Sequence, residues 1–425
     1  SGHSHRETIR APRSRSVSPL TRAIILLDRI EYKMIKEVIK NNSSEKIEKR
    51  YEELISNGII VEDEVDEFLT FKYWMNKAKY QNKTLTITLL TTYRCNFNCK
   101  YCFEGSRKSE EGKIEIGEMI SFLENLITKL KPKFIDFNFF GGEPLLEIDI
   151  LKIICEFLNE VEEKFSTKKS INIITNGYLI NSQLISELRE LKVNSFQITI
   201  DGNENAHDKR RVLYNGSGTF KIVYNNTLKL IENGFEVVIN MNFDNSNYKS
   251  IIEFLEKFPR NLRNRVYIKF SPIIVTKNNR DNIDLENERG KAKIHKMLLK
   301  KLREYDYQMD INFMEYQPCL ANRAYSVIIA SDGNLSKCIY GVGDERFIIS
   351  NVKKDINKIL FDLFLSCEEE VNYKKECKKC TFLPLCAGGC KRQKVEEGIQ
   401  PYEILCRKEI IEDEIVEGII NFYCS

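Results

Sequence analysis

Short apolar runs alternate with helical patterns along the middle of the chain. From about Leu85 to Phe270 this alternation is typical of a parallel α/β sheet or barrel. Strands are expected at Leu85 to Leu90, Phe134 to Phe140, Ile171 to Thr175, Phe196 to Ile200, Glu236 to Asn242 and Val266 to Phe270. A long charged helix, from about Leu285 to Tyr305, is expected to follow.

The segment before this region differs in its pattern. Residues 1–22 are rich in Ser, Arg and Pro without hydrophobic periodicity, so we expect a disordered tail. Residues 23–80 contain an apolar run, a helix, and a second helix with Ser44 as its N-cap and Gly58 past its end. A hairpin from Ile59 to Phe68 completes a winged-helix-like module.

Composition narrows the class of protein. A chain of 425 residues has room for about three domains. The net charge of +3, from 65 basic and 62 acidic residues, gives no strong field for nucleic acid, so no nucleic-acid partner is expected. No apolar stretch approaches the ~20 residues that span a bilayer, and we expect a cytoplasmic protein without a membrane partner.

The cysteines carry the strongest chemical signal. Nine of the 13 lie between Cys319 and Cys424. In a reducing compartment, clustered thiols are metal ligands or redox groups more often than disulfides. With only four histidines in the chain, thiolates must supply most of the ligands.

A first cluster, Cys95, Cys99 and Cys102, follows the first expected strand. Three thiolates can hold three irons of a four-iron cluster and leave the fourth open, whereas structural zinc needs a fourth nearby ligand. This loop, with Tyr101 before the third cysteine, resembles the signature of the radical S-adenosylmethionine enzymes. The resemblance implies that the open iron chelates S-adenosylmethionine, whose reductive cleavage gives a 5′-deoxyadenosyl radical that abstracts hydrogen from a substrate.

Further motifs agree with a radical S-adenosylmethionine barrel. The turn Gly141-Gly142-Glu143-Pro144 is similar to the family's motif for the methionyl amino group. Other candidate cofactor contacts lie at carboxyl ends of strands or on one strand face, where such barrels build their sites: Thr175, Asn176, Asp201, Arg210, Asn240 and Asn242. Ordinary turns, a surface arginine and satisfied interior amides are the structural alternatives.

The cysteine-rich end predicts a second region of chemistry. Tyr325 to Ala330 and Leu335 to Ile339 read as a hairpin with a primed turn at Asp332-Gly333, which would bring Cys338 towards Cys319. The spacing of seven cysteines resembles the SPASM extension of radical S-adenosylmethionine enzymes. A zinc ribbon of Cys377, Cys380, Cys386 and Cys390 is the alternative.

The SPASM resemblance implies two auxiliary clusters, and so three [4Fe-4S] clusters in the chain. It assigns Cys377, Cys380, Cys386 and Cys406 to a distal cluster, and Cys319, Cys338 and Cys390 to a proximal one. Either Cys367 or Cys424 completes the proximal set, or one iron stays open and can bind a substrate thiolate. Cys155, in an apolar helix pattern, is expected to be a buried structural thiol.

The domains expected from these patterns are a tail (1–22), a winged-helix-like peptide-recognition domain (23–80), a partial (β/α)6 barrel (81–306) and a SPASM domain (307–425). This order resembles maturases of ribosomally made peptides, in which the first module binds the precursor leader by strand addition. Such an enzyme also needs an electron donor such as a flavodoxin or ferredoxin.

The expected activity is therefore hydrogen abstraction from a precursor peptide and formation of an intramolecular cross-link. A thioether is the first choice, with a carbon-carbon or ether link next. One alternative is a sulfatase-maturing enzyme that makes formylglycine, although that group has aspartate where this chain has Ile339. A non-catalytic iron-sulfur or zinc protein is the alternative of another class.

Overall fold

The computed structural model describes residues 14–17, 24–27, 65–104, 113–274, 288–308, 318–368, 371–400, 402–406 and 408–411, with single residues at 33, 52, 54, 56, 276 and 279. One nine-stranded sheet organises these residues, in the order β11-β10-β9-β3-β4-β5-β6-β7-β8. Six parallel strands form most of it: β3 (Thr84–Leu90), β4 (Phe134–Phe140), β5 (Lys168–Thr175), β6 (Ser195–Thr199), β7 (Glu236–Phe243) and β8 (Val266–Pro272).

All six strands lie where the sequence predicts them, so the α/β class is confirmed. Three further strands extend the sheet beyond β3. β9 (Ser326–Ile329) is parallel to β3, while β10 (Asn334–Ser336) and β11 (Ser350–Asn351) continue in antiparallel fashion. Because β8 and β11 do not pair within the described residues, the sheet is a partial barrel.

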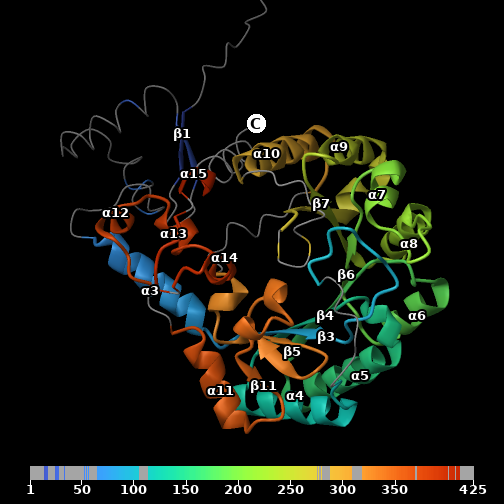
Figure 1. Ribbon diagram of the computed structural model, residues 1–425, viewed down its shortest axis with the longest axis horizontal. Coiled ribbons are helices and arrows are strands. Elements are labelled where there is room, and N and C mark those ends of the chain that lie inside the picture. Colours follow the sequence, from blue (N-terminus) through green and yellow to red (C-terminus); the bar gives the residue numbers. More distant parts are fainter. Residues whose placement is uncertain are drawn as a thin grey trace, which may run out of the picture.

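Helices cover the outer face of this sheet, as the rim of ribbons in Figure 1 shows. They are α4 (Ile116–Leu130), α5 (Ile148–Phe165), α6 (Ser182–Glu190), α7 (Glu204–Arg210), α8 (Phe220–Glu232), α9 (Tyr248–Lys257) and α10 (Glu288–Glu304), with short 3-10 turns at η1 (Pro144–Glu147) and η2 (Arg260–Arg265). The charged helix expected from about Leu285 is α10. No helix among the described residues has both the length and the apolar character to cross a membrane.

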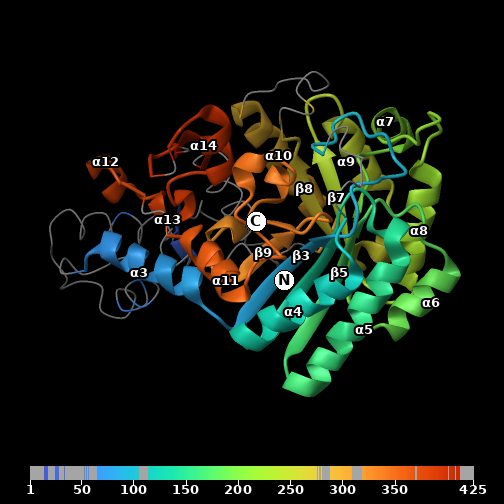
Figure 2. The same ribbon diagram turned by 60° about the horizontal axis from the view of Figure 1, so that its bottom comes forward.

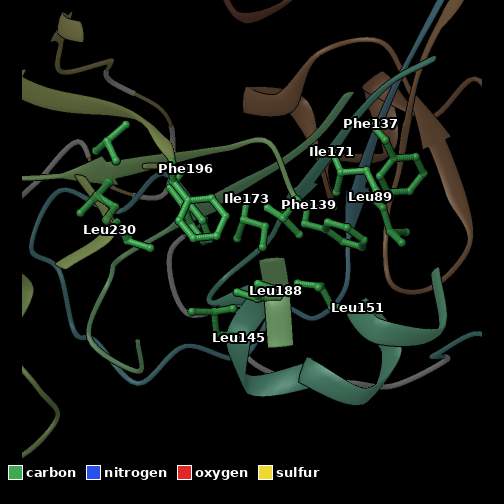
Figure 3. Packing of buried hydrophobic residues seen from close by; sticks show 14 of the residues in the cluster. Leu89, Phe137, Phe139, Leu145, Leu151, Ile171, Ile173, Leu188, Phe196 and Leu230 are labelled. Carbon is green, nitrogen blue, oxygen red and sulfur yellow. The ribbon is translucent and has the colours of Figure 1, made fainter. Parts of the chain in front are cut away.

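Alternation along the strands divides the sheet into an apolar and a polar face. On β4, Phe137 and Phe139 are completely buried and pack towards Leu151 of α5 and Leu188 of α6 (Figure 3). Successive side chains of a strand point to opposite faces, so Asp136 and Asn138, which alternate with these phenylalanines, point inward. The helices therefore take up the apolar face, and the inner face remains free for chemistry.

The C-terminal part wraps one edge of the sheet in Figure 2. It contains η5 (Leu320–Asn322), η6 (Ile339–Gly341), η7 (Glu345–Phe347), α11 (Ile356–Leu365), α12 (Lys375–Lys378), α13 (Leu383–Cys386), α14 (Lys391–Glu397) and α15 (Lys408–Ile411). The expected hairpin is β9-β10, but the primed turn is wrong. Of the turn residues Ser331, Asp332 and Gly333, only Gly333 is left-handed, with φ +79°. A three-residue loop that ends in a left-handed glycine closes the hairpin instead, with Gly333 N–H donating to Ala330 O at 2.9 Å.

The N-terminal expectations need two corrections. Ser14–Val17 forms β1, paired with β2 (Ile24–Leu27), so ladder hydrogen bonds order part of the expected tail. The end of the expected hairpin is helical, because the Asp66 carboxylate accepts from Leu69 N–H at 2.9 Å and caps α3 (Glu67–Tyr80). The rest of the tail, and both expected helices and the hairpin over residues 28–64 apart from four single positions, lie outside the described residues.

Candidate active site

The first three cysteines face one large cavity at the carboxyl ends of the parallel strands. Cys95, Cys99 and Cys102 are half-buried and line a cavity of about 1580 Å³. Their loop is tied to the segment after α7, because Asn98 N–H donates to Val212 O at 2.7 Å. Burial raises the pKa of the Cys95 thiol to about 12, so the thiol stays protonated unless a metal replaces the proton.

Tyr101 fixes the position of this loop. Its hydroxyl donates to the Asp201 carboxylate and accepts from Arg211 Nη1 at 2.7 Å and Asn242 Nδ2 at 3.1 Å. Asp201, which is completely buried, also accepts from Asn242 N–H at 3.0 Å. Burial raises the pKa of Tyr101 well above its usual value, so the hydroxyl remains a donor. The loop is thereby joined to the ends of β6 and β7.

The glycine turn after β4 packs directly against the chain that leads into Cys95. Gly142 N–H donates to Thr92 O at 3.0 Å, and a Cβ on Gly142 would lie 2.2 Å from Arg94 O. A Cβ on Gly141 would lie 2.4 Å from Thr92 O. Both positions therefore require glycine, and both line the cavity.

Glu143 lies behind the cavity wall. Its buried carboxylate accepts from Thr175 Oγ1 at 2.6 Å, Asn176 N–H at 2.8 Å and Leu145 N–H at 3.1 Å. Burial raises the pKa of this carboxyl group, whereas these donors lower it. Thr175 and Asn176 do line the cavity, and Asn176 Nδ2 reaches Asn96 Oδ1 at 2.7 Å. Glu143 thus joins two strand ends and is a structural carboxylate in this geometry.

Two adjacent arginines have different surroundings. Arg210 binds Asp244 at 2.8 Å and Ser246 at 3.0 Å, and it does not line the cavity. Arg211 does line it, and its guanidinium lies 5.5 Å from the Phe97 ring. Buried nitrogens of both side chains, Nε and Nη2 of Arg210 and Nε of Arg211, have no hydrogen-bond partner in the described structure. Sequence reasoning selected Arg210, whereas the structure places its neighbour Arg211 at the cavity. The signal lay in the end of α7, because one residue changes the direction of the side chain by more than a quarter turn.

The inner faces of the strands make a polar cavity wall. Asn240 accepts from Ser271 Oγ at 2.7 Å, and both Asn240 and Asn242 line the cavity, as their period-2 spacing predicts. Asp136 also faces it and accepts from Asn172 Nδ2 at 2.9 Å, while burial raises its pKa. The wall comprises Thr86, Thr88, Asp136, Asn138, Gln197, Thr199, Asn240, Asn242, Lys269 and Ser271.

A second group of thiols lines the same cavity. Cys319, Cys338 and Cys390 all belong to the lining. Burial, with smaller contributions from the nearby thiolates of Cys319 and Cys390, raises the pKa of Cys338 to about 11. This proximity is the one expected from the β9-β10 hairpin. It also weighs against a zinc ribbon, because Cys390 lies with these residues.

Lys337 holds the two arms of this group together. Its Nζ donates to the backbone oxygens of Arg323 at 2.6 Å, Ala324 at 3.1 Å and Ser326 at 2.6 Å. Burial lowers the pKa of Lys337 to about 8. Three carbonyl acceptors match the three N–H groups of an ammonium ion, because a neutral amine has only two. The chain after Cys319 is therefore fastened beside Cys338.

A third group of thiols lies on and around α12 and α13. Burial, followed by the neighbouring thiolates of Cys406, Cys380 and Cys386, raises the pKa of Cys377. Cys406 is exposed and the other three are half-buried. The segment between Cys386 and Cys390 is tightly turned, and a Cβ on Gly389 would lie 2.5 Å from Leu405 O. This close approach brings the chain before Cys406 against the turn.

Three cysteines, Cys155, Cys367 and Cys424, belong to none of these groups in the sequence assignment. Cys155 is completely buried in α5, as expected. Cys367, 2% exposed at the end of α11, does not line the cavity, and its thiol lies 3.8 Å from Ser366 Oγ. Cys424 is outside the described residues.

The first cavity thiols could hold a four-iron cluster. In the described ranges no three His, Cys, Asp or Glu side chains are arranged to hold one metal ion. A four-iron cluster makes a different demand, because each thiolate binds its own iron. Cys95, Cys99 and Cys102 supply three such thiolates on one loop, and the two glycines and the unpartnered Arg211 Nε leave polar space beside them.

Comparisons with known proteins place this geometry in context. The family model described as the Radical SAM superfamily matches residues 89–258. A cysteine-type anaerobic sulfatase-maturating enzyme of Clostridium novyi (strain NT) is 27% identical over 334 residues, covering 71% of this chain and 86% of the relative. The radical SAM cyclopropyl synthase TigE of Paramaledivibacter caminithermalis is 24% identical over 375 residues, which cover 80% of this chain and 75% of TigE.

The fold has solved counterparts. The crystal structure of Streptococcus suis SuiB bound to its precursor peptide SuiA matches with a TM-score of 0.60 and 14% identity, covering 92% of this chain and 95% of SuiB. At this identity the likeness concerns the fold alone.

We expect Gly142→Ala to lower the free energy of unfolding by about 1–3 kcal/mol, because its Cβ would collide with fixed backbone oxygens. Gly117→Ala is the matched control, since nothing lies within 4 Å of the new Cβ and alanine favours α4. Denaturant unfolding of the two variants checks this. Equal shifts would contradict the close approach at Gly142.

Proposed function

Because the chain is an enzyme of the radical SAM superfamily, with that domain over residues 89–258, we propose that it is a peptide maturase that forms an intramolecular cross-link, by preference a thioether. The observation that carries this proposal is the shared cavity. Cys95, Cys99 and Cys102 line it, and so do Cys319, Cys338 and Cys390. A peptide placed between them would meet a source of radicals and a second set of thiolates.

The residues that would hold the cofactor follow from their positions. Cys95, Cys99 and Cys102 would bind a [4Fe-4S] cluster, which together with S-adenosylmethionine supplies the radical that takes a hydrogen atom from the substrate. Gly141 and Gly142 leave space for the methionyl group at the backbone. The Arg211 guanidinium would hold a carboxylate by charge-assisted hydrogen bonds.

The lining of the cavity favours a peptide as substrate. Its volume of about 1580 Å³ also has to hold the cluster and S-adenosylmethionine, so the argument rests on the side chains of the wall. Amides such as Asn138, Gln197 and Asn240 line the wall and both donate and accept hydrogen bonds. They suit a peptide backbone, which presents both kinds of group. SuiB, similar in fold, has been crystallised with a precursor peptide.

The proximal thiols favour a thioether over other links. Joining a thiol to a carbon removes a hydrogen atom from the carbon, a proton from the thiol and one electron. Cys319, Cys338 and Cys390 give three ligands at the cavity, and the buried Cys367 is not in its lining. These three residues would hold a cluster with one iron open, and such a cluster would supply a binding site for a soft ligand such as the substrate sulfur. A carbon-carbon or ether link is next, because neither uses this sulfur site.

A sulfatase-maturing activity is the second candidate, since the Clostridium novyi relative spans most of this chain. Ile339 supplies no carboxylate beside Cys338, which makes this candidate second. The precursor leader would bind the N-terminal module of residues 23–80, and the auxiliary clusters would comprise Cys319, Cys338 and Cys390 and, separately, Cys377, Cys380, Cys386 and Cys406.

Joint replacement of Cys95, Cys99 and Cys102 by Ala should remove about four of about twelve irons from anaerobically reconstituted protein and abolish 5′-deoxyadenosine formation. Cys155→Ala is the matched control and should keep all of them, because Cys155 lies in the helix core. Iron analysis and chromatography give both readouts. A triple variant that still made 5′-deoxyadenosine would refute the cluster assignment.

Arg211→Lys should weaken S-adenosylmethionine binding by about tenfold to a hundredfold, because lysine loses the planar pair of donors. Arg210→Lys is the neighbouring control, and it should affect affinity much less since Arg210 faces Asp244. Equilibrium binding to reconstituted protein measures both. If the two variants lost affinity equally, Arg211 would not be the carboxylate ligand.

Cys338→Ser should lower iron content and stop cross-linking, whereas Cys367→Ser should retain both, because Cys367 lies off the cavity. A precursor with its acceptor Cys changed to Ser should bind without being cross-linked. Iron analysis measures the clusters of each enzyme variant, and mass spectrometry of the precursor measures the cross-link. Loss of iron in Cys367→Ser would mean four protein thiolates at the proximal site and remove the argument for direct sulfur ligation.

A further inference from the structure

Three aromatic side chains from distant segments of the chain meet in the cavity. We define the aromatic cluster as Phe103, Phe140 and Tyr340, all of which belong to the cavity lining. The rings of Phe103 and Phe140 are stacked with their centroids 6.3 Å apart. The rings of Phe103 and Tyr340 meet edge to face at 4.9 Å. The aromatic cluster is therefore assembled only when the cysteine loop, the sheet and the C-terminal part fold together.

The aromatic cluster joins the two groups of thiols that line the cavity. Phe103 directly follows Cys102, and Tyr340 comes two residues after Cys338, in η6. Burial, and after it the neighbouring Cys338 thiolate, raises the pKa of Tyr340, so its side chain is a neutral phenol. The contact between the Phe103 and Tyr340 rings thus connects the first cysteine loop with the turn that contains Cys338.

The inner face of β4 changes from polar to aromatic at its last residue. Asp136, Asn138 and Phe140 share this face, because side chains of a strand alternate. Phe140 also directly precedes Gly141, which begins the glycine turn. The aromatic cluster is therefore placed where the polar wall ends and the glycine turn begins.

Packing alone does not account for the exposure of these rings. Phe137 and Phe139, which pack against the helices on the other face of β4, are completely buried. The three rings of the aromatic cluster are only half-buried, although each contacts another ring. Part of their apolar surface is consequently open to the cavity, where a bound apolar group would cover it.

We propose that the aromatic cluster is the subsite for the side chain of the precursor residue that loses hydrogen, and that this side chain is apolar. This inference rests on the proposed function, which brings a peptide between the two groups of thiols. The amides of the wall suit the peptide backbone, whereas the rings offer an apolar side chain a surface to bury.

A polar or charged side chain is disfavoured at this subsite. It would give up its hydrogen bonds to water, and the faces and edges of phenylalanine rings provide none in return. Arg392 lies with its guanidinium 5.9 Å from the Tyr340 ring, but its charge is already paired with Glu396. The surroundings of the aromatic cluster therefore select against a carboxylate as well as against an amide.

The probe is a set of synthetic peptides that contain one Cys and differ at one residue X, which is Leu, Asn or Asp. These side chains are close in shape, so the comparison isolates polarity. X carries deuterium on its carbons. Transfer of that deuterium to 5′-deoxyadenosine breaks a bond in X and identifies X as the residue that loses hydrogen. Dithionite supplies the electron for each cofactor cleavage.

Reconstituted enzyme receives the three peptides as an equimolar mixture, and mass spectrometry follows each of them. We expect the Leu peptide to react at least about tenfold faster than the Asn and Asp peptides, because the binding of an apolar side chain contributes roughly that much or more. This comparison uses the unmodified enzyme and remains decisive if a variant folds poorly.

Phe140→Gln tests the aromatic cluster itself and should reduce the preference for the Leu peptide about tenfold. Phe140→Leu keeps the surface apolar and should retain the preference. Phe165→Gln is the matched control, because it removes a ring, 38% exposed, that does not line the cavity. A purely structural role of Phe140 would instead slow all three peptides by the same factor.

Calorimetry without S-adenosylmethionine gives a readout that does not depend on turnover. The Leu peptide should bind about tenfold more tightly than the Asn and Asp peptides, with a more negative heat-capacity change, since apolar surface is buried. Both differences should disappear in Phe140→Gln and persist in Phe165→Gln.

The subsite is overturned if the Asn or Asp peptide reacts as fast as the Leu peptide, or if the preference survives Phe140→Gln. Equal cross-linking of all three peptides would leave the proposed function intact and remove the subsite alone. Deuterium transfer in the expected order without any cross-link would support the subsite and contradict the cross-linking function. Absence of deuterium transfer from every peptide would overturn both.

Discussion

The buried Asp201 carboxylate is the constraint on which the site depends. A charge without water must be paired or hydrogen-bonded, and here the donors are the Tyr101 hydroxyl and the backbone of Asn242. Tyr101 belongs to the cysteine loop, and Asn242 to β7. Satisfying one carboxylate therefore fixes the loop against the sheet, and Arg211 completes the arrangement by donating to the same hydroxyl.

The outer face of the sheet packs against helices, whereas its inner face lines the cavity. Phe137 and Phe139 bury the outer face under α5 and α6. Asp136 and Asn138, which alternate with them along β4, line the cavity. A parallel sheet covered on both faces is usually apolar throughout. A polar inner face indicates a sheet whose interior is meant for a ligand.

Local pattern was sufficient to predict the strands and the cysteine groups, because a period of two and the spacing of thiols are written directly into neighbouring residues. Local pattern was insufficient where a shift of one residue decides which way a side chain points. Arg210 and Arg211 are chemically identical in sequence, and only the end of α7 turns the second into the cavity. Asp66 looked like part of an acidic hairpin, but its carboxylate caps a helix. The role of Glu143 behind the wall depended on Thr175 and Asn176, which lie on another strand.

The turn through Gly388 and Gly389 has a consequence for how such a protein can change over time. The order of cysteines crosses between the two thiol groups, with Cys386 in the outer group and Cys390 in the inner one. No single continuous segment therefore contains all the cysteines of one group and none of the other. Removing the outer group while keeping Cys390 would need two separate deletions, one before Cys390 and one after it.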